Sequence, residues 1–298
     1  MLLPKFIYHE PRSLDEATRL MADLGKDSRV LAGGTDLLVK MKRRKIFPKH
    51  VVYLARIEEM KKVKPDHGSF TIGACVTVAD LKEQEEVKTF FGGLSEAAGS
   101  LGSPLIRNLA TVGGNLVTAS PAADLPPPLI AYGANLLLKR ENGKRIVPLE
   151  KFFVGPGQTI LEPEEILSSI VVNRPPRFSG CGYIKLGVRR SLEISIVNVA
   201  AFLVLDGPSG RIRDARIVLG AVSPTPIRSP SAESALIGRG TDEDIFKKAG
   251  EEAARDARPI DDFRGSAEYR REMVKVLTRK ALRMASDKAK LNESRRDK

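Results

Sequence analysis

Two pairs of adjacent glycines are the residues whose types and spacing best suit a chemical role. The first pair lies in VLAGGTDLL (30–38) and the second in ATVGGNLVTASPAADLPPP (110–128). Glycine adopts positive φ readily and has no Cβ to keep a ligand away from the main chain. Successive peptide N–H groups in such a turn form a concave anion site. Each pair is therefore a candidate for holding a phosphate-bearing cofactor.

Polar residues flank both pairs. Thr35 and Asp36 follow the first pair where a helical turn is expected to begin, and either side chain could cap it. Thr111 and Asn115 bracket the second pair. A helix N-terminus behind such a turn would add a favourable dipole for an anion. One glycine pair alone more often marks a plain tight turn, whereas two pairs with matching neighbours make a turn and a cofactor site equally good interpretations.

Several other chemistries lack their motifs. Neither glycine pair belongs to GxxxxGK[ST] or to GxGxxG, so the nucleotide-triphosphate loop and the doubly wound dinucleotide fingerprint are absent. Cys75 and Cys181 are far apart, cannot hold a cluster or a structural zinc by themselves, and are predicted to be reduced, buried thiols. His9, His50 and His67 have no metal-ligand spacing.

Three prolines at 126–128 are expected to begin a helix, because proline is tolerated in a first helical turn. Asp124 lies just ahead of them. Its carboxylate could cap that helix or accept a hydrogen bond from a ribose hydroxyl. The sequence alone favours the cap.

Length and composition indicate a globular protein of two or three domains or subdomains, since the chain has 298 residues and ordinary hydrophobic content. No apolar run reaches the ~20 residues of a membrane helix, and the N-terminus lacks a signal-peptide layout, so we expect a cytoplasmic protein. The net charge of +12 is concentrated in 40–50 and 280–298. Such charge suits a polyanion, an acidic partner or a solvated face. The absence of tryptophan argues against nucleic acid.

Expected strands and helices alternate over the first half of the chain, which predicts α/β units. A capping box of Ser13 and Glu16 begins a helix that ends near Gly25. The other expected segments are strands in 28–34, 50–57 and 69–77, a hairpin over 135–149, a strand at the end of 162–173 and a break at 174–180. Beyond the break we expect strands in 182–188, 194–206 and 211–222, a hairpin turn at 207–210, and helices in 231–238, 241–257 and 266–286.

These motifs in this order resemble the FAD-binding subunit of the molybdenum hydroxylases, which is the medium chain of bacterial carbon monoxide dehydrogenase and xanthine dehydrogenase-like enzymes. The resemblance spans the whole chain. The segments that carry it are LAGGTDLLVKMK (31–42), TVGGNLVTASPAADLPPPLIAYGANLLL (111–138), YIKLGVRRSLEISIVNVA (183–200) and SAEYRREMVKVLTRKAL (266–282).

The resemblance implies an α+β fold. Residues 1–177 would form a vanillyl-alcohol-oxidase (PCMH)-type FAD-binding domain of two α/β subdomains, about 1–57 and 58–177. Residues 178–288 would form a C-terminal flavoprotein domain with a three-stranded antiparallel sheet and helices. Residues 289–298 would be a charged tail.

The resemblance also implies the FAD site. Backbone N–H groups of 31–37 and 111–115, with the Thr35 and Thr111 hydroxyls, would hold the pyrophosphate. Asp124 would contact a sugar or the ribityl chain in place of capping. The residues implied to contact FAD are Leu31, Ala32, Gly33, Gly34, Thr35, Asp36, Leu37, Leu101, Thr111, Gly113, Gly114, Asn115, Ser120, Asp124, Leu167 and Lys185.

In that family the substrate is hydroxylated at a molybdenum cofactor on a large partner subunit, and electrons pass through [2Fe-2S] centres of a small partner subunit. This chain would take them onto FAD and deliver them to NAD, a quinone or another acceptor, within a heterotrimer or its dimer. No residue of this chain would be catalytic toward the substrate, and it would bind no metal. The segment after Arg190 departs from the aspartate-rich stretch of many relatives, which weakens any role for Glu193. The two cysteines cannot supply the extra iron–sulfur cluster that some relatives carry on an inserted loop.

Two other functions remain open. A self-sufficient FAD oxidoreductase of the same fold would usually carry a covalent flavin link through His or Cys, and none of these residues lies in the glycine motifs. A basic, non-enzymatic nucleic-acid-binding protein would be colourless and would bind with strong salt dependence. An absorption spectrum separates the flavoproteins from the latter.

Overall fold

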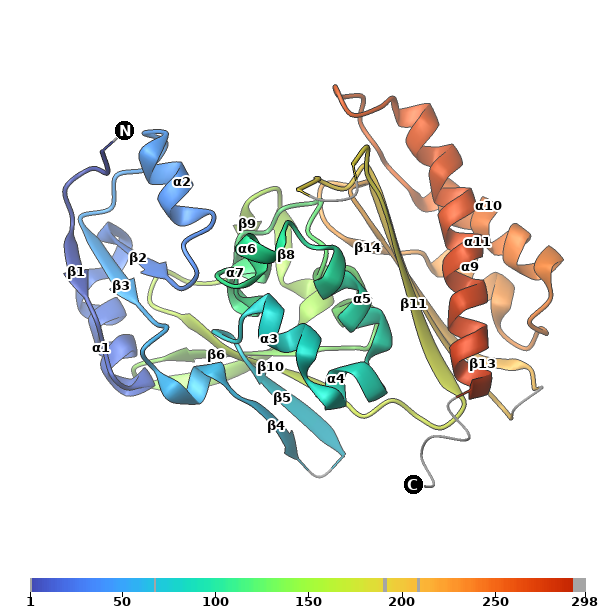
Figure 1. Cartoon of the computed structure of the whole chain (residues 1–298), viewed down its shortest axis with the longest axis horizontal. Coiled ribbons are helices and arrows are strands. Elements are labelled where there is room, and N and C mark those ends of the chain that lie inside the picture. Colours follow the sequence, from blue (N-terminus) through green and yellow to red (C-terminus); the bar gives the residue numbers. More distant parts are fainter. Residues whose placement is uncertain (1, 67, 190–191, 208–209, 292–298) are drawn as a thin grey trace.

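The computed structural model describes residues 2–66, 68–189, 192–207 and 210–291. Its sheets follow one another along the molecule (Figure 1). A small sheet near the N-terminus is followed by a larger sheet covered by short helices, and then by a C-terminal sheet whose far face is covered by the longest helix. No helix among the described residues is both long and apolar enough to cross a membrane.

The N-terminal sheet is three-stranded and parallel, in the order β1-β3-β2. Its elements are β1 (Ile7–His9), α1 (Leu14–Leu24), η1 (Gly25–Asp27), β2 (Ser28–Leu31), α2 (Leu37–Lys42) and β3 (His50–Tyr53). The predicted cap of α1 is confirmed, because the Ser13 hydroxyl accepts a hydrogen bond from the Glu16 N–H at 3.1 Å. The Glu16 carboxylate accepts from the N–H of Arg12, one residue before the position that a capping box requires.

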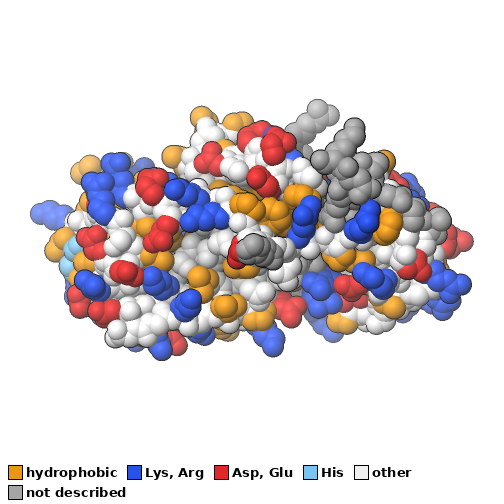
Figure 2. All heavy atoms as spheres, turned by 90° about the horizontal axis from the view of Figure 1, so that it is seen from below, with side chains coloured by type: hydrophobic (Ala, Val, Ile, Leu, Met, Phe, Trp, Pro, Cys, Tyr) orange, Lys and Arg blue, Asp and Glu red, His pale blue; other side chains and the backbone are white. Residues whose placement is uncertain are grey.

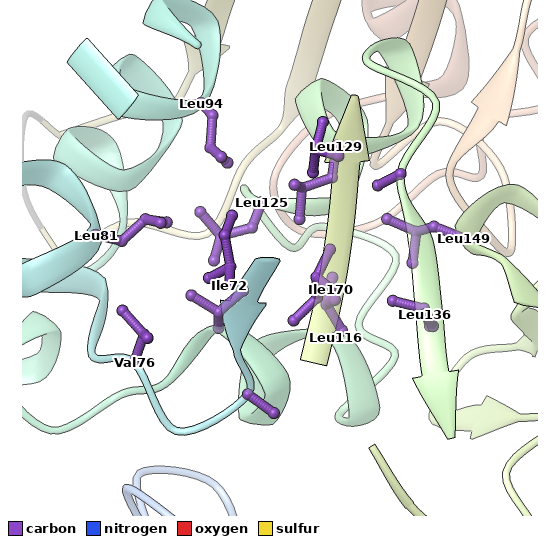
Figure 3. Close-up of a cluster of buried hydrophobic side chains, with 14 of the residues drawn as sticks. Ile72, Val76, Leu81, Leu94, Leu116, Leu125, Leu129, Leu136, Leu149 and Ile170 are labelled. Atoms are coloured by element: carbon purple, nitrogen blue, oxygen red, sulfur yellow. The ribbon is translucent and has the colours of Figure 1, made fainter. Parts of the chain in front are cut away.

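The central sheet is five-stranded and antiparallel, in the order β4-β5-β10-β6-β7. The hairpin predicted over 135–149 is confirmed, since Arg140 pairs with Gly143. The elements are η2 (Glu58–Lys61), β4 (Val63–Asp66), β5 (Ser69–Gly73), α3 (Val78–Glu83), α4 (Glu85–Phe90), α5 (Gly92–Ser100), α6 (Pro104–Arg107), α7 (Val112–Val117), α8 (Pro126–Ala131), β6 (Asn135–Arg140), β7 (Gly143–Pro148), η3 (Leu149–Lys151), β8 (Phe153–Gly155), β9 (Gln158–Thr159) and β10 (Ile166–Asn173). Leu129 of α8 and Leu125, which precedes that helix, pack toward Ile170 of the sheet (Figure 3).

The C-terminal sheet is antiparallel and has four strands, in the order β11-β12-β13-β14. The elements are β11 (Ser179–Leu186), β12 (Val197–Leu205), β13 (Ile212–Gly220), β14 (Ile227–Arg228), α9 (Pro230–Leu236), α10 (Glu243–Asp256) and α11 (Ala267–Leu291). The hairpin turn predicted at 207–210 includes residues 208–209, and the charged tail includes 292–298. Both of these ranges lie outside the described residues.

The expectation of three strands in this sheet is wrong. The extra strand, β14, pairs with β13 through Val218 and Leu219. It is two residues long and stands between Pro226 and Pro230. No periodicity is visible in so short a run, and nearby prolines argue against a strand. An edge strand tolerates them because one side of its backbone needs no partner in the sheet.

The C-terminal sheet is buried on both faces. Along β12, Ala200, Phe202 and Val204 belong to the core of the central sheet and its helices. The alternate residues Val199 and Ala201 belong to a second core with α10 and α11. Because strand residues alternate between faces, the near-continuous apolar run of β12 follows from its place between two cores.

Glycines of β11 bring α11 against the sheet. A Cβ at Gly182 would lie 2.4 Å from the Ala281 carbonyl oxygen and 2.8 Å from Met284 Cβ. A Cβ at Gly180 would lie 2.1 Å from the Ala285 carbonyl oxygen. These positions therefore set the separation of the helix from the sheet.

We expect Gly182→Ala to lower the free energy of unfolding by about 1–3 kcal/mol, because an added methyl group overpacks this contact. Gly207→Ala is the matched control, since no atom of the described residues lies within 4 Å of its Cβ and its φ is not positive; it should change stability by less than about 0.5 kcal/mol. Urea unfolding measures both. Equal midpoints for the two variants would contradict the close approach of α11.

Candidate functional site

A cleft of about 740 Å³ lies between the N-terminal sheet and the helices of the central sheet. Most of its lining comes from three parts of the chain, 28–37, 101–118 and 159–167, and single residues such as Lys26, Lys40 and Cys75 complete it. Small-molecule sites in proteins commonly have volumes of about 300–1,000 Å³. The cleft therefore has room for a ligand of cofactor size.

Most of the residues predicted from the sequence line this cleft. Leu31, Ser120, Asp124 and Lys185 lie outside its lining. The predicted residues that line it are Ala32, Gly33, Gly34, Thr35, Asp36, Leu37, Leu101, Thr111, Gly113, Gly114, Asn115 and Leu167.

The first glycine loop presents free peptide N–H groups. Those of Gly33, Gly34 and Thr35 donate no hydrogen bond within the part of the chain that the structure describes. Gly34 has a φ of +73°, the left-handed conformation that glycine favours. Asp36 stands at the N-cap of α2, but its side chain makes no capping hydrogen bond. The loop thus offers backbone donors to a ligand.

The missing Cβ of Gly33 has a different role from the one suggested by the sequence. A Cβ there would lie 1.9 Å from the carbonyl oxygen of Leu109. Ala110, next to Leu109, lines the cleft. This glycine therefore lets the first loop meet the 101–118 wall, and it shapes the cleft through contact between two backbones.

The second glycine loop uses its peptide N–H groups inside the protein. The N–H groups of 112–115 donate to the carbonyl oxygens of Val76, Ala74 and Thr111 and to the Thr111 hydroxyl, at 2.8–3.1 Å. These hydrogen bonds hold the second loop against the loop after β5. The loop therefore presents side chains and Cα atoms to the cleft, and its N–H groups are already engaged.

Gly114 and Asn115 are the half-buried residues of this second loop that line the cleft. A Cβ at Gly114 would meet only the Thr111 hydroxyl, at 2.9 Å, and is otherwise open. Its φ is not positive, so its value to a ligand is its lack of bulk. The Oδ1 atom of Asn115 is buried without a hydrogen-bond partner. An acceptor in that state is costly unless a ligand donates to it.

An ion pair positions the third wall, which the sequence did not reveal. The Arg145 guanidinium donates to both carboxylate oxygens of Glu165 at 2.6 and 2.7 Å, and to the Ile160 carbonyl oxygen at 2.8 Å. The Glu162 N–H donates to Glu165 at 2.9 Å. Burial raises the pKa of the Glu165 carboxyl, but these hydrogen bonds outweigh burial and the net pKa is lowered. Arg145 lies in β7 and Glu165 lies just before β10, 20 residues along the chain, so no local pattern indicates the pair.

Asp124 lies at the centre of a buried polar cluster (the Asp124 cluster: Asp124, Tyr183, Lys185, Ser195 and Asn198). Its carboxylate accepts from the Tyr183 hydroxyl at 2.8 Å, the Lys185 ammonium at 2.9 Å and the Ser195 hydroxyl at 3.2 Å. Burial raises the pKa of Asp124, against the opposing effects of the ammonium and the hydroxyls. The cluster joins the loop before α8 to the C-terminal sheet.

The prediction that Asp124 caps α8 is wrong. The N-cap residue of α8 is Leu125, and no side chain caps the helix. A capping carboxylate needs an N–H at the second or third helical position. Those positions are Pro127 and Pro128, which have no N–H. The carboxylate instead accepts hydrogen bonds from Tyr183, Lys185 and Ser195.

Both cysteines are free and buried, as predicted. Burial raises the thiol pKa to about 12 for Cys75 and also for Cys181. Cys75 lines the cleft. His9 and His50 lie 3.0 Å apart, nitrogen to nitrogen, between neighbouring strands. Within the described residues, no three His, Cys, Asp or Glu side chains gather in a way that could hold a metal ion.

Comparison with protein families gives two matches. A model described as "FAD binding domain in molybdopterin dehydrogenase" matches residues 4–175. A model described as "CO dehydrogenase flavoprotein C-terminal domain" matches residues 183–285. Together the two matches cover nearly all residues of the two hydrophobic cores.

Relatives match over nearly the full length. The carbon monoxide dehydrogenase medium chain of Hydrogenophaga pseudoflava is 33% identical over 96% of this chain and 98% of its own. The xanthine dehydrogenase FAD-binding subunit of Escherichia coli O157:H7 is 31% identical over 92% and 94%. A solved structure of the H. pseudoflava carbon monoxide dehydrogenase, which lacks the Mo-pyranopterin moiety, superposes with a TM-score of 0.91, again at 33% identity and covering 96% and 98% of the two chains.

We expect Glu165→Gln to lower the free energy of unfolding by about 1–3 kcal/mol at pH 7, because a charge-assisted pair is lost. A carboxyl whose folded pKa is lowered stabilises the fold above its unfolded pKa, about 4.3, and that contribution is lost as the pH falls through the folded value. The difference from the unsubstituted chain should therefore shrink below about pH 4.

Glu164→Gln is the matched control, since the Glu164 side chain is 48% exposed and lies 3.8 Å from Arg140. It should cost less than about 0.5 kcal/mol. Urea unfolding at pH 7 and at acid pH measures both variants. A pH-independent effect of Glu165→Gln would count against the ion pair as its cause.

Proposed function

Because this chain belongs to the family of FAD-binding subunits of molybdopterin dehydrogenases, we propose that it binds FAD in the cleft and transfers electrons from the [2Fe-2S] centres of a partner subunit to an acceptor such as NAD or a quinone. The observation that carries the proposal is the free peptide N–H groups of 33–35 in a cleft of cofactor size.

The donors of the first loop suit a diphosphate. Peptide N–H groups that face a cavity without protein acceptors favour an anion there. Lys26, Arg29 and Lys40 also line the cleft and bring positive charge to this end. The Thr35 hydroxyl adds a donor beside the loop. The residues present therefore fit the pyrophosphate of FAD.

The other walls of the cleft suit the remaining parts of FAD. Asn115 Oδ1 can accept from a hydroxyl or amine of the cofactor. Leu101 and Leu167 give the cleft apolar surface for a ring. The Thr111 hydroxyl accepts from the Gly114 N–H and keeps its own hydrogen to donate. Because the N–H groups of 112–115 are engaged, we assign the pyrophosphate chiefly to the first loop.

Ser120, Asp124 and Lys185 stay predicted contacts of FAD, with Asp124 at a sugar or the ribityl chain. All three lie outside the lining of the cleft, and the Asp124 carboxylate is bound to Lys185 of β11. Lys185 is held by Asp124 and by the Ser100 carbonyl oxygen at 3.2 Å, and Ser100 adjoins Leu101 of the wall. We propose that the Asp124 cluster supports the site at this wall.

When bound, FAD supplies the redox chemistry, since a flavin accepts and releases electrons. The chain holds the cofactor, orients it and excludes water from it. We propose a division into 1–177, with subdomains of about 1–57 and 58–177, a C-terminal domain of 178–288 and a charged tail of 289–298. We also propose large molybdenum-cofactor and small [2Fe-2S] partner subunits, in a heterotrimer or its dimer in the cytoplasm. The medium-chain names of the relatives support such partners.

The observed charges give no support to a nucleic-acid surface on the face seen in Figure 2. Lys and Arg side chains there are interspersed with Asp and Glu. Several Lys and Arg side chains of the described residues are paired with carboxylates, such as Lys139 with Asp15 at 2.7 Å. Nucleic-acid sites instead cluster cations of one sign on one face.

We expect Gly114→Val to reduce bound flavin by at least about tenfold, because its side chain would occupy the open space above Gly114 and crowd the cofactor. Gly99→Val is the control, since Gly99 is also helical and partly buried and its Cβ would meet only Lys82 at 3.6 Å. Flavin absorbance relative to protein absorbance, after denaturation, measures the content of each variant.

Lys185→Ala should lose less flavin than Gly114→Val, because one charged contact contributes modestly. Normal flavin content in Gly114→Val would contradict the placement of the site. A greater loss in Lys185→Ala would reverse the ranking of the contacts.

A further inference from the structure

We propose that Glu96, which does not line the cleft, is a positioning residue for the FAD site. It holds β11 against α5 in the register that brings the Tyr183 hydroxyl and the Lys185 ammonium to Asp124. The proposal rests on the proposed function, because it takes the Asp124 cluster as a support of the FAD site.

Glu96 acts at the edge of the C-terminal sheet. Among the described strands β11 pairs with β12 alone, so one side of its backbone has no partner strand. The N–H of Tyr183, a buried residue, donates instead to Glu96 Oε2 at 3.1 Å. A buried N–H that loses its acceptor costs free energy. Glu96 therefore supplies the acceptor that a neighbouring strand would otherwise provide.

Lys288 of α11 fixes the Glu96 carboxylate. Its ammonium donates to Glu96 Oε1 at 2.6 Å and to the Cys181 carbonyl oxygen at 2.8 Å. Figure 1 shows α5 and α11 on either side of β11, and both helices contact that strand. The ion pair thus crosses the edge of β11 and binds backbone groups of Cys181 and Tyr183. Hydrogen bonds between charged groups are short and strong, so the carboxylate has a defined place from which to hold the strand.

A second contact between α5 and β11 fixes the register. The Lys185 ammonium donates to the Ser100 carbonyl oxygen at 3.2 Å. Ser100 lies one helical turn after Glu96, and Lys185 lies two residues after Tyr183. One turn rises about 5.4 Å and two strand residues span about 6.6 Å, so both contacts can form together. A shift of β11 by one residue would turn the Lys185 side chain to the opposite face.

α5 comes close enough to β11 for these contacts because residue 93 is glycine. A Cβ at Gly93 would lie 2.5 Å from Cys181 Sγ and 3.0 Å from Cys181 Cβ. Cys181 and Tyr183 also belong to the hydrophobic core of the central sheet and its helices. The helix and the strand are thus packed together as well as hydrogen-bonded.

The effect of Glu96 reaches Asp124 through Tyr183. The N–H of Tyr183 binds Glu96, and its hydroxyl donates to Asp124 at 2.8 Å. A displaced Tyr183 backbone therefore moves the hydroxyl away from Asp124, and Lys185 on the same strand moves with it. Asp124 is 5% exposed, and a buried carboxylate depends on such donors. Glu96 thus orders the Asp124 cluster without contacting the cofactor.

The test titrates the full chain, stripped of cofactor, with FAD and measures the dissociation constant from flavin fluorescence. Glu96→Ala removes the acceptor of the Tyr183 N–H, and we expect it to weaken FAD binding about three- to tenfold. Glu96→Gln keeps an amide oxygen for that N–H, so it should bind within about twofold of the unsubstituted chain. Both variants lose the ion pair with Lys288, so a purely structural ion pair would make their losses equal.

Glu272→Ala is the matched control, because it removes an ion pair of α11 with Lys275, also at 2.6 Å, whose side chains are exposed. It should leave the FAD affinity unchanged. The double variant Glu96→Ala/Lys185→Ala should lose little more than the larger of the two single losses, since both residues act through the Asp124 cluster. Independent residues would instead multiply their losses.

Three results would overturn the proposal: unchanged affinity in Glu96→Ala, equal losses in the alanine and glutamine variants, or a double variant whose loss is the product of the single ones. The proposed function fails separately, if the unsubstituted chain binds no FAD. Amide hydrogen exchange at Tyr183 in the FAD-free chain tests the contact by itself. It should be at least about fivefold faster in Glu96→Ala than in Glu96→Gln, and equal rates would also overturn the proposal.

Discussion

The site depends on backbone N–H groups that the fold leaves without a protein acceptor. A buried or half-buried peptide N–H nearly always finds a partner, because leaving one unpaired costs free energy. Those of 33–35 have none among the described residues. The loop is nevertheless held in place, by the left-handed conformation of Gly34 and by the contact of Gly33 with the Leu109 carbonyl oxygen. The donors are therefore positioned before an anion binds, and no part of the binding free energy is lost in ordering them.

Contacts elsewhere in the structure fix the walls of that site relative to one another. The second glycine loop is tied by its own N–H groups to the loop after β5, and Arg145 ties the 159–165 wall to β7 through Glu165. The Asp124 cluster ties the loop before α8 to β11. β12 is buried on both faces, so the C-terminal sheet lies between two hydrophobic cores. Local motion of any one wall would therefore disturb a hydrogen-bonded or buried contact with another.

Local patterns predicted local structure well. The cap of α1, the hairpin over 135–149 and the two free buried cysteines all follow from residue types within a few positions. The failures have physical causes. β14 is too short for periodicity and stands between prolines. The Asp124 cap failed because Pro127 and Pro128 offer no N–H, which was readable in the sequence. The Arg145–Glu165 pair joins β7 to the segment before β10, and no single-sequence pattern reports a contact between residues so far apart in the chain.

The glycine pairs show why a site can be located from sequence before its chemistry is understood. The sequence suggests that both pairs lack a Cβ in order to face a ligand, yet at Gly33 and Gly113 another part of the chain lies where the Cβ would be, the Leu109 carbonyl oxygen in one case and Ala74 in the other. Close approach of two backbones and close approach of a ligand leave the same residue in the sequence. At Gly34 too, a Cβ would meet the chain itself, at the Leu38 and Leu31 side chains, and of the four glycines Gly114 has the most open space where its Cβ would lie. Only the direction of the missing Cβ separates the two roles, and that direction depends on the fold of the whole chain.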